Sequence, residues 1–302
     1  MANPFTARRQ WAAAVIAFFF SPFVAMLYLN RGKLALVYLA AGFVNAALAI
    51  WLAPAAFANQ LAPVSYLLEL PVTIAGTIHA WNIARRWDAG AARAWYSHWY
   101  AAFAIWLIFP LSAFLIRTFL YQPFSIPSVS NEPALVPGDY IFVSKSAYNS
   151  RAPERGDMVV FKMPNPASSD FGKDYVKRIV GLPGDRVQMV NGQLAINGTM
   201  VPRRRIADYV EVVDGTAQHV LQYEESLPGG RKDTILDRMT DGPLDNTGIY
   251  VVPPGHYFTL GDNRDNSDDS REDVGYVPRD AIIGRVAVKF VSGGHLVWQA
   301  VN

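Results

Sequence analysis

Apolar positions dominate the first third of the chain and form long runs without charge. The first run covers residues 11–29 and contains Pro22, which is expected to kink a helix. A second uncharged run, 34–68, is interrupted by the stretch APAAFANQLAP, and a third apolar segment continues to about Trp81. Runs of this length are typical of helices that cross a bilayer, so the region predicts two helices, near 34–53 and 63–82, joined by a short hairpin.

A fourth apolar segment extends from Tyr100 to Ile116, with the aromatic cluster WYSHWY before it and Arg117 after it. Aromatic and basic residues in such places are typical of bilayer interfaces. Because apolar segments recur up to residue 116, a single cleavable leader is excluded, and residues 1–120 are expected to form three or four membrane-embedded helices. Glu69, in the third segment, is either an intramembrane functional carboxylate or, as we favour, a residue at the outer interface.

Basic residues orient these segments, because loops rich in Lys and Arg tend to stay in the cytoplasm. They lie in two connections: Arg31 and Lys33 between the first and second segments, and Arg85, Arg86 and Arg93 before the fourth. Both connections are therefore expected in the cytoplasm, and the chain after Arg117 outside it. Four full spans would place Arg8 and Arg9 outside, against the same tendency, so three alternatives stay open for the first segment: it spans the bilayer, is re-entrant or lies at the interface.

After residue 123 the pattern changes to short β-rich runs that follow Gly-Asp pairs: PGDYIFV, RGDMVVF, PGDRVQM and LGDNRDN. Turn residues that bound strands of four to six residues predict antiparallel hairpins, and hence an all-β domain over residues 121–302. Residues 186–250 are more polar and irregular, and they are expected to form an insertion with small hairpins of its own.

The composition agrees with this division. The 302 residues are 51% hydrophobic and 13% aromatic, with a mean hydropathy of +0.12, which is more apolar than an ordinary soluble protein. The net charge of +2 comes without a long basic run, which argues against a nucleic-acid partner. The chain has no cysteine, so disulfides, thiol nucleophiles and thiolate metal ligands are excluded.

Two serines, Ser128 and Ser130, stand one residue apart at the start of the β region and are candidate nucleophiles. A serine nucleophile needs a base to accept its proton, and histidine is the usual one. Four histidines lie in or beside apolar segments, in the insertion or near residue 302: His79, His98, His219 and His295. The fifth, His256, lies in the predicted core, where a structural role is favoured.

The sequence contains no set of residues that matches a zinc peptidase site or a calcium loop. No H-E-x-x-H motif is present. The acidic stretch DNRDNSDDSRED offers no register that combines alternating oxygen ligands with a glycine at position six and a glutamate at position twelve, as a calcium loop requires. A zinc peptidase site and a calcium loop are therefore excluded.

A lysine can act as the base when burial lowers its pKa towards neutrality. Lys177 lies in the stretch DYVKRIVGLPGD, where the alternation of a strand places Tyr175, Lys177 and Ile179 on one face. Arg178 points the other way and cannot lose its proton, so Lys177 is the candidate base. Taken alone, a lysine in a strand is more often a solvated edge residue.

Several motifs in a fixed order strengthen this assignment: RTFLYQPFSIPSVS, PGDYIFVSK, RGDMVVFK, YVKRIVGLPGD and VVPPGHYFTLGDNRDNSDDSR. From about residue 117 to 294 the chain resembles bacterial type I signal peptidases (leader peptidases), or a divergent paralogue of them. These are membrane-anchored serine proteases with a Ser-Lys dyad. The resemblance implies a role for each of six residues: Ser130 as nucleophile, Lys177 as general base, Ser128 in the oxyanion site with the Ser130 backbone N–H, Ser267 orienting the lysine, and Asp269 with Arg271 as a supporting ion pair.

The resemblance also implies the fold and the substrate. The fold is an antiparallel all-β catalytic core with an inserted β subdomain, here about 186–250, and its active site opens next to the membrane. The substrates are exported pre-proteins, held by their signal peptides and cut after small residues in an Ala-x-Ala-like pattern. The enzyme is expected in the bacterial cytoplasmic membrane, with its catalytic domain on the extracytoplasmic face and without a cofactor or metal.

Two positions after the nucleophile depart from the family pattern: Asn131 stands in place of the usual Met, and Ala134 in place of Thr. Met is apolar and adaptable, whereas Asn131 followed by Glu132 is expected to make this corner of the substrate pocket polar. Two alternatives to a signal peptidase stay open: another Ser-Lys self-processing hydrolase, and a catalytically weak membrane protein that captures signal peptides.

Overall fold

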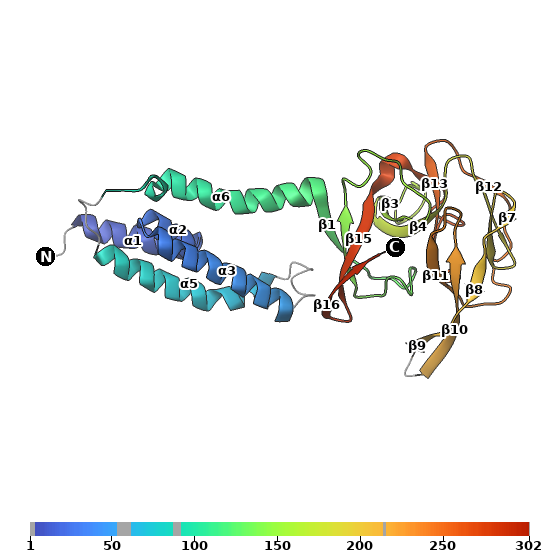
Figure 1. Ribbon diagram of the computed structural model, residues 1–302, viewed down its shortest axis with the longest axis horizontal. Helices are drawn as coiled ribbons and strands as arrows, with labels where there is room; N and C mark the ends of the chain where they lie inside the picture. The colour runs from blue at the N-terminus through green and yellow to red at the C-terminus, as the bar shows by residue number, and fades with distance from the viewer. Residues whose placement is uncertain (1–3, 53–61, 87–91, 214–215, 302) are drawn as a thin grey trace. The chain divides into compact units, whose positions relative to one another are not determined.

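The computed structural model describes residues 4–52, 62–86, 92–213 and 216–301. The chain forms two compact units, Met1–Thr118 and Phe119–Asn302 (Figure 1). The first unit is helical and the second consists mostly of strands, in agreement with the change of pattern near residue 123.

The first apolar run forms two helices instead of one kinked helix. Ser21 caps the second of them, because its Oγ accepts a hydrogen bond from the Val24 N–H at 3.3 Å. Pro22 stands at the first helical position, where its missing N–H leaves no bond unmade. The helical elements are α1 (Pro4–Phe19), α2 (Pro22–Tyr28), α3 (Gly32–Leu52), α5 (Ala62–Arg85), η1 (Trp95–Ser97), α6 (Trp99–Leu115) and the π-helical turn η2 (Ile116–Leu120).

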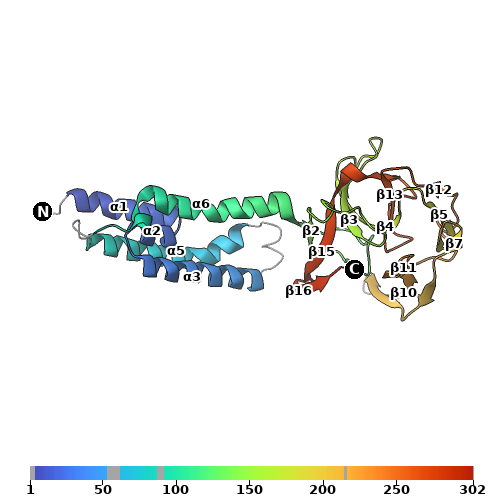
Figure 2. The same cartoon turned by 45° about the horizontal axis from the view of Figure 1, so that its top comes forward.

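Helices α3 and α5 confirm the two helices predicted at 34–53 and 63–82. The hairpin predicted between them falls mainly on residues 53–61 and lies outside the described residues. Helices α1 and α5 run side by side in both views (Figures 1 and 2). Four fully buried alanines contribute to their common core: Ala13, Ala17, Ala80 and Ala84. Small side chains at such positions let helix backbones approach closely.

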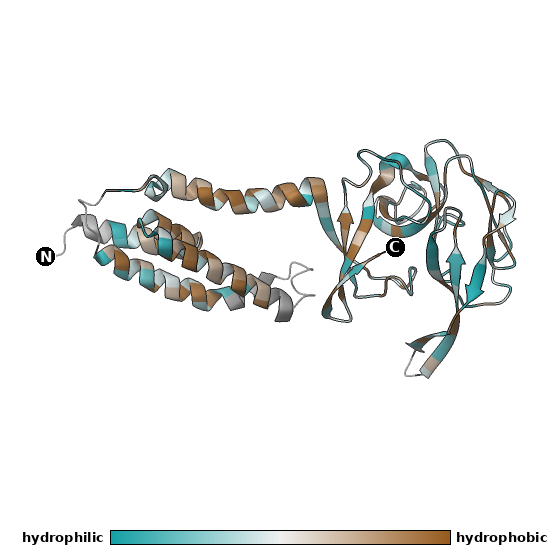
Figure 3. Cartoon of the chain, in the orientation of Figure 1, coloured by the Kyte–Doolittle hydropathy of each residue, from teal (hydrophilic) through white to brown (hydrophobic). Residues whose placement is uncertain are grey.

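The surface of the helical unit carries many large apolar side chains, and the hydropathy colouring of α6 is largely apolar (Figure 3). Within the described residues, one helix is long and apolar enough to cross a membrane: Trp99–Leu120, with a hydropathy of 1.9. A shorter apolar helix covers Gly32–Leu48. Three or four membrane spans are expected from the sequence. Among the described residues, length and hydropathy support one of them, so the multi-pass topology is not supported. Glu69 is exposed.

Three antiparallel sheets make up the described part of the second unit. The largest has the order β1-β2-β15-β3-β4-β13-β14, with β16 paired to β15; the others have the orders β11-β10-β8, with β9 paired to β10, and β12-β5-β6-β7. The strands are β1 (Tyr121–Ser125), β2 (Tyr140–Ser144), β3 (Met158–Lys162), β4 (Asp174–Gly181), β5 (Arg186–Val190), β6 (Gln193–Ile196), β7 (Thr199–Met200), β8 (Arg203–Arg205), β9 (Tyr209–Val213), β10 (Thr216–Ser226), β11 (Lys232–Asp237), β12 (Tyr250–Val251), β13 (His256–Leu260), β14 (Val277–Pro278), β15 (Ile282–Ser292) and β16 (His295–Ala300).

The strands from β5 to β12 belong to the two smaller sheets, whereas the large sheet is built from strands that precede and follow them in the sequence. They cover the expected insertion, 186–250. The unit is thus mostly β, as predicted. A separate inserted subdomain stays a proposal, because residues 119–302 form one compact unit.

Three of the Gly-Asp pairs make the same turn before a strand, as the repeated pattern predicts. The glycine has a positive φ of 88° or 89° in each, a conformation that favours glycine: Gly138, Gly156 and Gly184. The following aspartate accepts a hydrogen bond from the N–H three residues before it: Val136 to Asp139, Glu154 to Asp157, and Leu182 to Asp185. These turns set the starts of β2, β3 and β5.

The fourth pair, Gly261 and Asp262, is not a turn of this kind, so this part of the prediction is wrong. Asp262 is buried and forms an ion pair with Arg178. A Cβ at Gly261 would collide with Ser267 Oγ and with the Ser130 carbonyl oxygen. Glycine is needed here because two distant segments of the chain meet against its Cα.

Candidate active site

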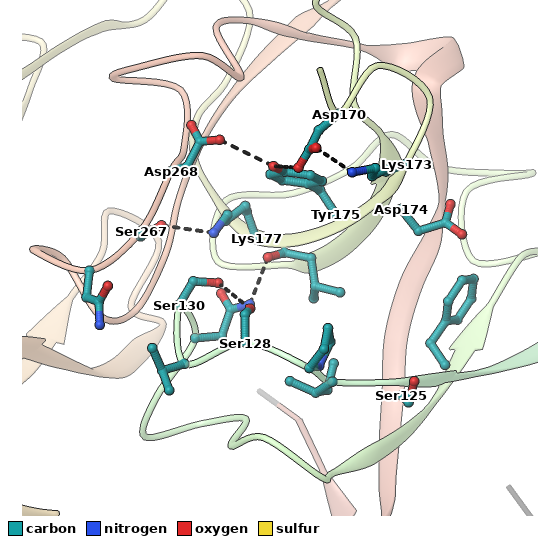
Figure 4. Close-up of a pocket in the computed structure, with 17 residues that line it drawn as sticks. Ser125, Ser128, Ser130, Asp170, Lys173, Asp174, Tyr175, Lys177, Ser267 and Asp268 are labelled. Atoms are coloured by element: carbon teal, nitrogen blue, oxygen red, sulfur yellow. Dashed lines mark hydrogen bonds and ion pairs between the residues drawn. The ribbon is translucent and has the colours of Figure 1, made fainter. Parts of the chain in front are cut away.

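Ser128 and Ser130 lie on the segment between β1 and β2. Their hydroxyl oxygens are 3.2 Å apart, within hydrogen-bonding distance. Ser128 is exposed and Ser130 is partly buried. Both line a cavity of about 480 Å³ whose other walls come from β4 and from the loop after β13 (Figure 4). The cavity therefore unites segments that are far apart in the sequence.

Lys177 supplies a buried amine to this cavity. The residue lies on β4, is 3% exposed and donates a hydrogen bond from Nζ to Ser267 Oγ at 2.9 Å. Figure 4 shows the amine pointing into the region between Ser267 and Ser130. Lys177 is thus not the solvated edge residue that a lone lysine in a strand suggests.

Burial determines the proton affinity of this amine. Removal from water disfavours an ammonium ion, and burial lowers the pKa of Lys177 to about 8. The carboxylates of Asp269 and Asp268 oppose this change, while the Arg271 guanidinium lowers the pKa further. At about pH 8, a large share of Lys177 is therefore neutral and able to accept a proton.

Arg178, the next residue of β4, is also buried but is bound by carboxylates. Its Nε and Nη2 donate to Asp262 at 2.8 Å, and its Nη1 lies 2.7 Å from Asp233 Oδ1. Burial acts to lower the pKa of Arg178, but the two carboxylates outweigh it and raise this pKa, so the side chain stays charged. Burial also raises the pKa of Asp233 to about 6. The two cations of β4 face different partners, as strand alternation predicts.

Asp269 and Arg271 form a buried ion pair near Lys177. Arg271 donates from Nη2 and Nε to the two carboxylate oxygens at 2.8 and 2.9 Å, and the Gly261 N–H donates to the same carboxylate at 3.1 Å. Burial alone would raise the pKa of Asp269, but the Arg271 guanidinium and these hydrogen bonds lower it. The pair therefore stays ionised and fixes the loop that carries Ser267.

Asn263 holds the segment that carries Ser128 and Ser130 in place, and no role for Asn263 is predicted from the sequence motifs. Its Nδ2 donates to the Val129 carbonyl at 3.0 Å, and its backbone N–H donates to the Ser130 carbonyl at 3.1 Å. Its Oδ1 accepts a hydrogen bond from Arg238 Nε at 2.9 Å. The available signal was its place in the motif LGDNRDN, but a motif does not reveal a contact with a segment 134 residues earlier.

Of the two residues expected to make a corner of the pocket polar, Asn131 lines the cavity, whereas Glu132 is not part of its wall. Both residues are buried, with exposed fractions of 2% and 7%. Asn131 lines the cavity but donates from Nδ2 to the Val176 carbonyl at 2.8 Å, so this donor is engaged with β4. Glu132 lies 3.5 Å from the Arg238 guanidinium, and its pKa is raised by burial against the effect of that cation.

Other titratable side chains lie near the serines, and some of them are hydrogen-bonded to one another. The Tyr175 hydroxyl donates to Asp170 at 2.9 Å and lies 3.3 Å from an Asp268 oxygen. His256 Nδ1 lies 3.0 Å from the Pro254 carbonyl oxygen, and His256 is not part of the cavity wall. Within the described ranges, no three His, Cys, Asp or Glu side chains are grouped so that they could hold a metal ion.

Comparisons with known proteins assign the chain to a family. The family model described as signal peptidase, peptidase S26, matches residues 97–291, which is more than half of the chain and includes all six candidate residues. The chain belongs to this signal peptidase family. The candidate serines and lysine are therefore part of a peptidase.

Relatives of this signal peptidase carry the same description. Signal peptidase I of Rickettsia typhi is 35% identical over 199 residues, covering 57% of this chain and 73% of the relative. That of Rickettsia akari is 34% identical over 213 residues, covering 62% and 76%. A solved signal peptidase I from Enterococcus faecalis is 27% identical and covers 45% of this chain and 98% of its own, but its TM-score of 0.27 is too low for a comparison of folds. The chain is thus a peptidase of a family that acts on signal peptides.

Proposed function

We propose that this signal peptidase is a membrane-bound serine endopeptidase in which Ser130 is the nucleophile and Lys177 the general base. The observation that carries the proposal is the buried Lys177 amine, which is hydrogen-bonded to Ser267 and lines the same cavity as Ser130. With a pKa lowered to about 8, this amine can exist in the neutral form that a base requires. Membership of the family supports the reaction class.

In the first half-reaction, Ser130 Oγ attacks the carbonyl carbon of the scissile peptide bond, and its proton passes to Lys177 Nζ. The ammonium group then gives this proton to the nitrogen of the leaving amide, so the mature protein departs with a free amine. The signal peptide stays attached to Ser130 as an ester. Lys177 therefore serves first as base and then as acid.

In the second half-reaction, Lys177 accepts a proton from the water that attacks this ester, and it returns the proton to Ser130 Oγ. The signal peptide leaves with a free carboxylate. Both half-reactions pass through an oxyanion, for which we propose the Ser130 N–H and the Ser128 hydroxyl as donors. The 3.2 Å contact between the two hydroxyl oxygens supports this role for Ser128. Loss of one such donor typically costs about 3 kcal/mol.

Ser267, Asp269 and Arg271 are the proposed positioning residues of the lysine. Ser267 accepts the Nζ hydrogen bond and so restricts the rotation of the amine. The Asp269–Arg271 pair fixes the loop that carries Ser267. Because the two members of the pair act on the pKa of Lys177 in opposite directions, they support the site without restoring the ammonium form.

We assign residues 1–120 to a membrane domain and 121–302 to an extracytoplasmic catalytic domain, with 186–250 as an inserted β subdomain. The helix Trp99–Leu120 supports anchoring in the bilayer of a bacterial cytoplasmic membrane, and the other helices would add further passes. The substrates are the signal peptides of exported pre-proteins, cut after small residues in an Ala-x-Ala-like pattern. The family match supports this substrate class.

Cleavage of a pre-protein with an Ala-x-Ala site by the detergent-purified full chain tests the proposal. Products are read by intact mass for wild type, Ser130→Ala and Lys177→Met, at a pH above 8 where the amine is mostly neutral. We expect processing at the predicted bond by wild type alone. Cleavage by either variant at the wild-type rate would refute the dyad. Bound but uncut substrate in all three would favour a protein that captures signal peptides.

A further inference from the structure

Asn131 links the neighbour of the proposed nucleophile to the neighbour of the proposed base. It directly follows Ser130, and its Nδ2 donates a hydrogen bond at 2.8 Å to the carbonyl of Val176, which directly precedes Lys177. Asn131 is 2% exposed and lines the cavity. This hydrogen bond therefore crosses from the nucleophile segment to β4 beside the reacting groups.

Stability alone does not favour an amide at this position. Asn131 Oδ1 is buried and has no hydrogen-bond partner in the described part of the chain. A buried polar atom without a partner typically costs about 1–3 kcal/mol, which offsets the gain from the Nδ2 bond. An apolar side chain of similar volume would avoid the unpaired oxygen. The amide therefore needs an explanation other than packing.

The nucleophile segment is also attached to the loop after β13. Asn263 binds the carbonyls of Val129 and Ser130, and the same loop carries Ser267, which holds the Lys177 amine. Asn131 supplies the complementary attachment, to β4 itself. The segment is thus held from two sides, and both attachments act on the separation of Ser130 and Lys177.

We propose that Asn131 is a positioning residue that sets the separation of Ser130 Oγ and Lys177 Nζ. The inference rests on the proposed function, since it takes these two atoms as the reacting pair. Misplacement of a reacting group by about 1 Å can lower a rate about 10²-fold. Loss of the hydrogen bond therefore lowers kcat, whereas KM changes little because the other walls of the cavity are unaltered.

Asn131→Leu removes the hydrogen bond and keeps a side chain that branches at Cγ. We expect kcat to fall about 10- to 100-fold with KM nearly unchanged. The Tm should change little, because loss of the bond and loss of the unpaired oxygen have opposite effects. Asn165→Leu is the matched control, since it removes the same kind of bond, from Nδ2 to the Asp273 carbonyl at 2.9 Å, outside the cavity. This control should retain the wild-type kcat.

Asn131→Asp gives an independent readout, because an aspartate has nearly the same shape but donates only when protonated. Its ionised form has no proton for the Val176 carbonyl and, as a nearby anion, raises the pKa of Lys177. While this carboxyl is ionised, the ratio of its kcat to that of wild type should therefore fall as the pH drops through about 8, because Lys177 of the variant takes up its proton at a higher pH than Lys177 of wild type. The same ratio for Asn131→Leu should stay flat, so the pair separates positioning from a general loss of structure.

Three results would overturn the inference: a wild-type kcat in Asn131→Leu, an equal loss of kcat in Asn165→Leu, or a flat ratio for Asn131→Asp. Ser130→Ala, measured alongside, distinguishes a failure of the proposed function from a failure of the positioning role of Asn131. If Ser130→Ala cleaves at the wild-type rate, the proposed function fails. If Ser130→Ala is inactive and Asn131→Leu is fully active, only the positioning role of Asn131 fails.

Discussion

The helical unit and the β unit differ in what they bury. In the described helical unit the buried residues are almost all apolar, and the hydroxyl of buried Ser97 is satisfied by the Ala94 carbonyl at 2.8 Å. The β unit buries many charged residues, such as Arg264 with Glu225. Because an unpaired buried charge is costly, a buried cation bound to a neutral hydroxyl stands out in this unit. That cation is Lys177, so energetics and motifs lead to the same residue.

The same contrast holds between two adjacent residues of β4. Arg178 is neutralised by Asp262 and Asp233, and its pKa is raised although burial acts to lower it. Lys177 donates to Ser267 instead, and burial lowers its pKa. One cation is therefore suited to structure and the other to proton transfer. The following variants, ordered by the size of the expected effect, test this division.

Loss of the reacting groups should have the largest effect. Ser130→Ala and Lys177→Met are expected to lower kcat by about 10⁴-fold or more, since members of a catalytic unit act together. Lys177→Met also replaces a buried cation with an apolar chain of similar length, so the Tm should stay equal or rise. Cleavage assays and thermal unfolding in detergent check both. A large fall in Tm would instead mark Lys177 as a structural cation.

Arg178→Met should act on stability. Its removal leaves Asp262 and Asp233 as uncompensated buried charges, which typically costs about 3–5 kcal/mol in the free energy of unfolding. Arg204→Met is the matched control, because Arg204 is 72% exposed in its ion pair with Glu224, and such pairs contribute about 0–1 kcal/mol. Denaturant unfolding compares the two. Equal losses of unfolding free energy in the two variants would show that burial does not determine how much these ion pairs contribute to stability.

Ser267→Ala should have a smaller effect on catalysis than loss of the lysine. The amine would keep its burial but lose the acceptor at 2.9 Å that orients it, so we expect kcat to fall about 10- to 100-fold. Ser270→Ala is the control in the same loop, because the Ser270 hydroxyl accepts from the Thr259 N–H at 2.9 Å. If Ser270→Ala lowers kcat as much as Ser267→Ala, the effect belongs to the loop and not to the lysine contact.

Ser21→Ala should have the smallest effect and should be confined to the helical unit. It removes the N-cap of α2, which typically costs about 1 kcal/mol of stability, and should leave cleavage unchanged. Ser112→Ala is the comparison within this unit, because the Ser112 hydroxyl donates to the Phe109 carbonyl and caps no helix. Thermal unfolding in detergent reads both. A loss of activity in Ser21→Ala would show that the two units do not act separately.

Much of the fold could be predicted from local patterns. Uncharged runs predict α3 and α5, and Gly-Asp pairs predict the turns at Gly138, Gly156 and Gly184, because both signals depend on neighbouring residues. The pair at Gly261 has the same letters but a different environment. The space beside its Cα is filled by Ser267 of the same loop and by Ser130 from a distant segment, and the contact with Ser130 could not be predicted from a local pattern.

The candidate site shows the same limit. Motif order indicates Ser130 and Lys177, and the structure places both in the wall of one cavity. The burial of Asn131 and the hydrogen bond from Asn263 to the Val129 carbonyl could not be predicted, because both depend on carbonyl groups of other segments. The sequence does not show which backbone carbonyl groups accept these hydrogen bonds. Asn131 lines the cavity as expected, but the hydrogen bond from its side chain to β4 is a contact that the sequence does not reveal.

The pH dependence of kcat/KM for wild-type cleavage tests the central claim most directly, because it reports the pKa of the essential base in the free enzyme. Lys177 must be neutral to act, so activity should rise with pH and reach half of its plateau near pH 8, where burial has brought the pKa of this lysine. A rate that is independent of pH through this range, or that falls as the pH rises through about 8, would contradict the assignment of Lys177 as the base.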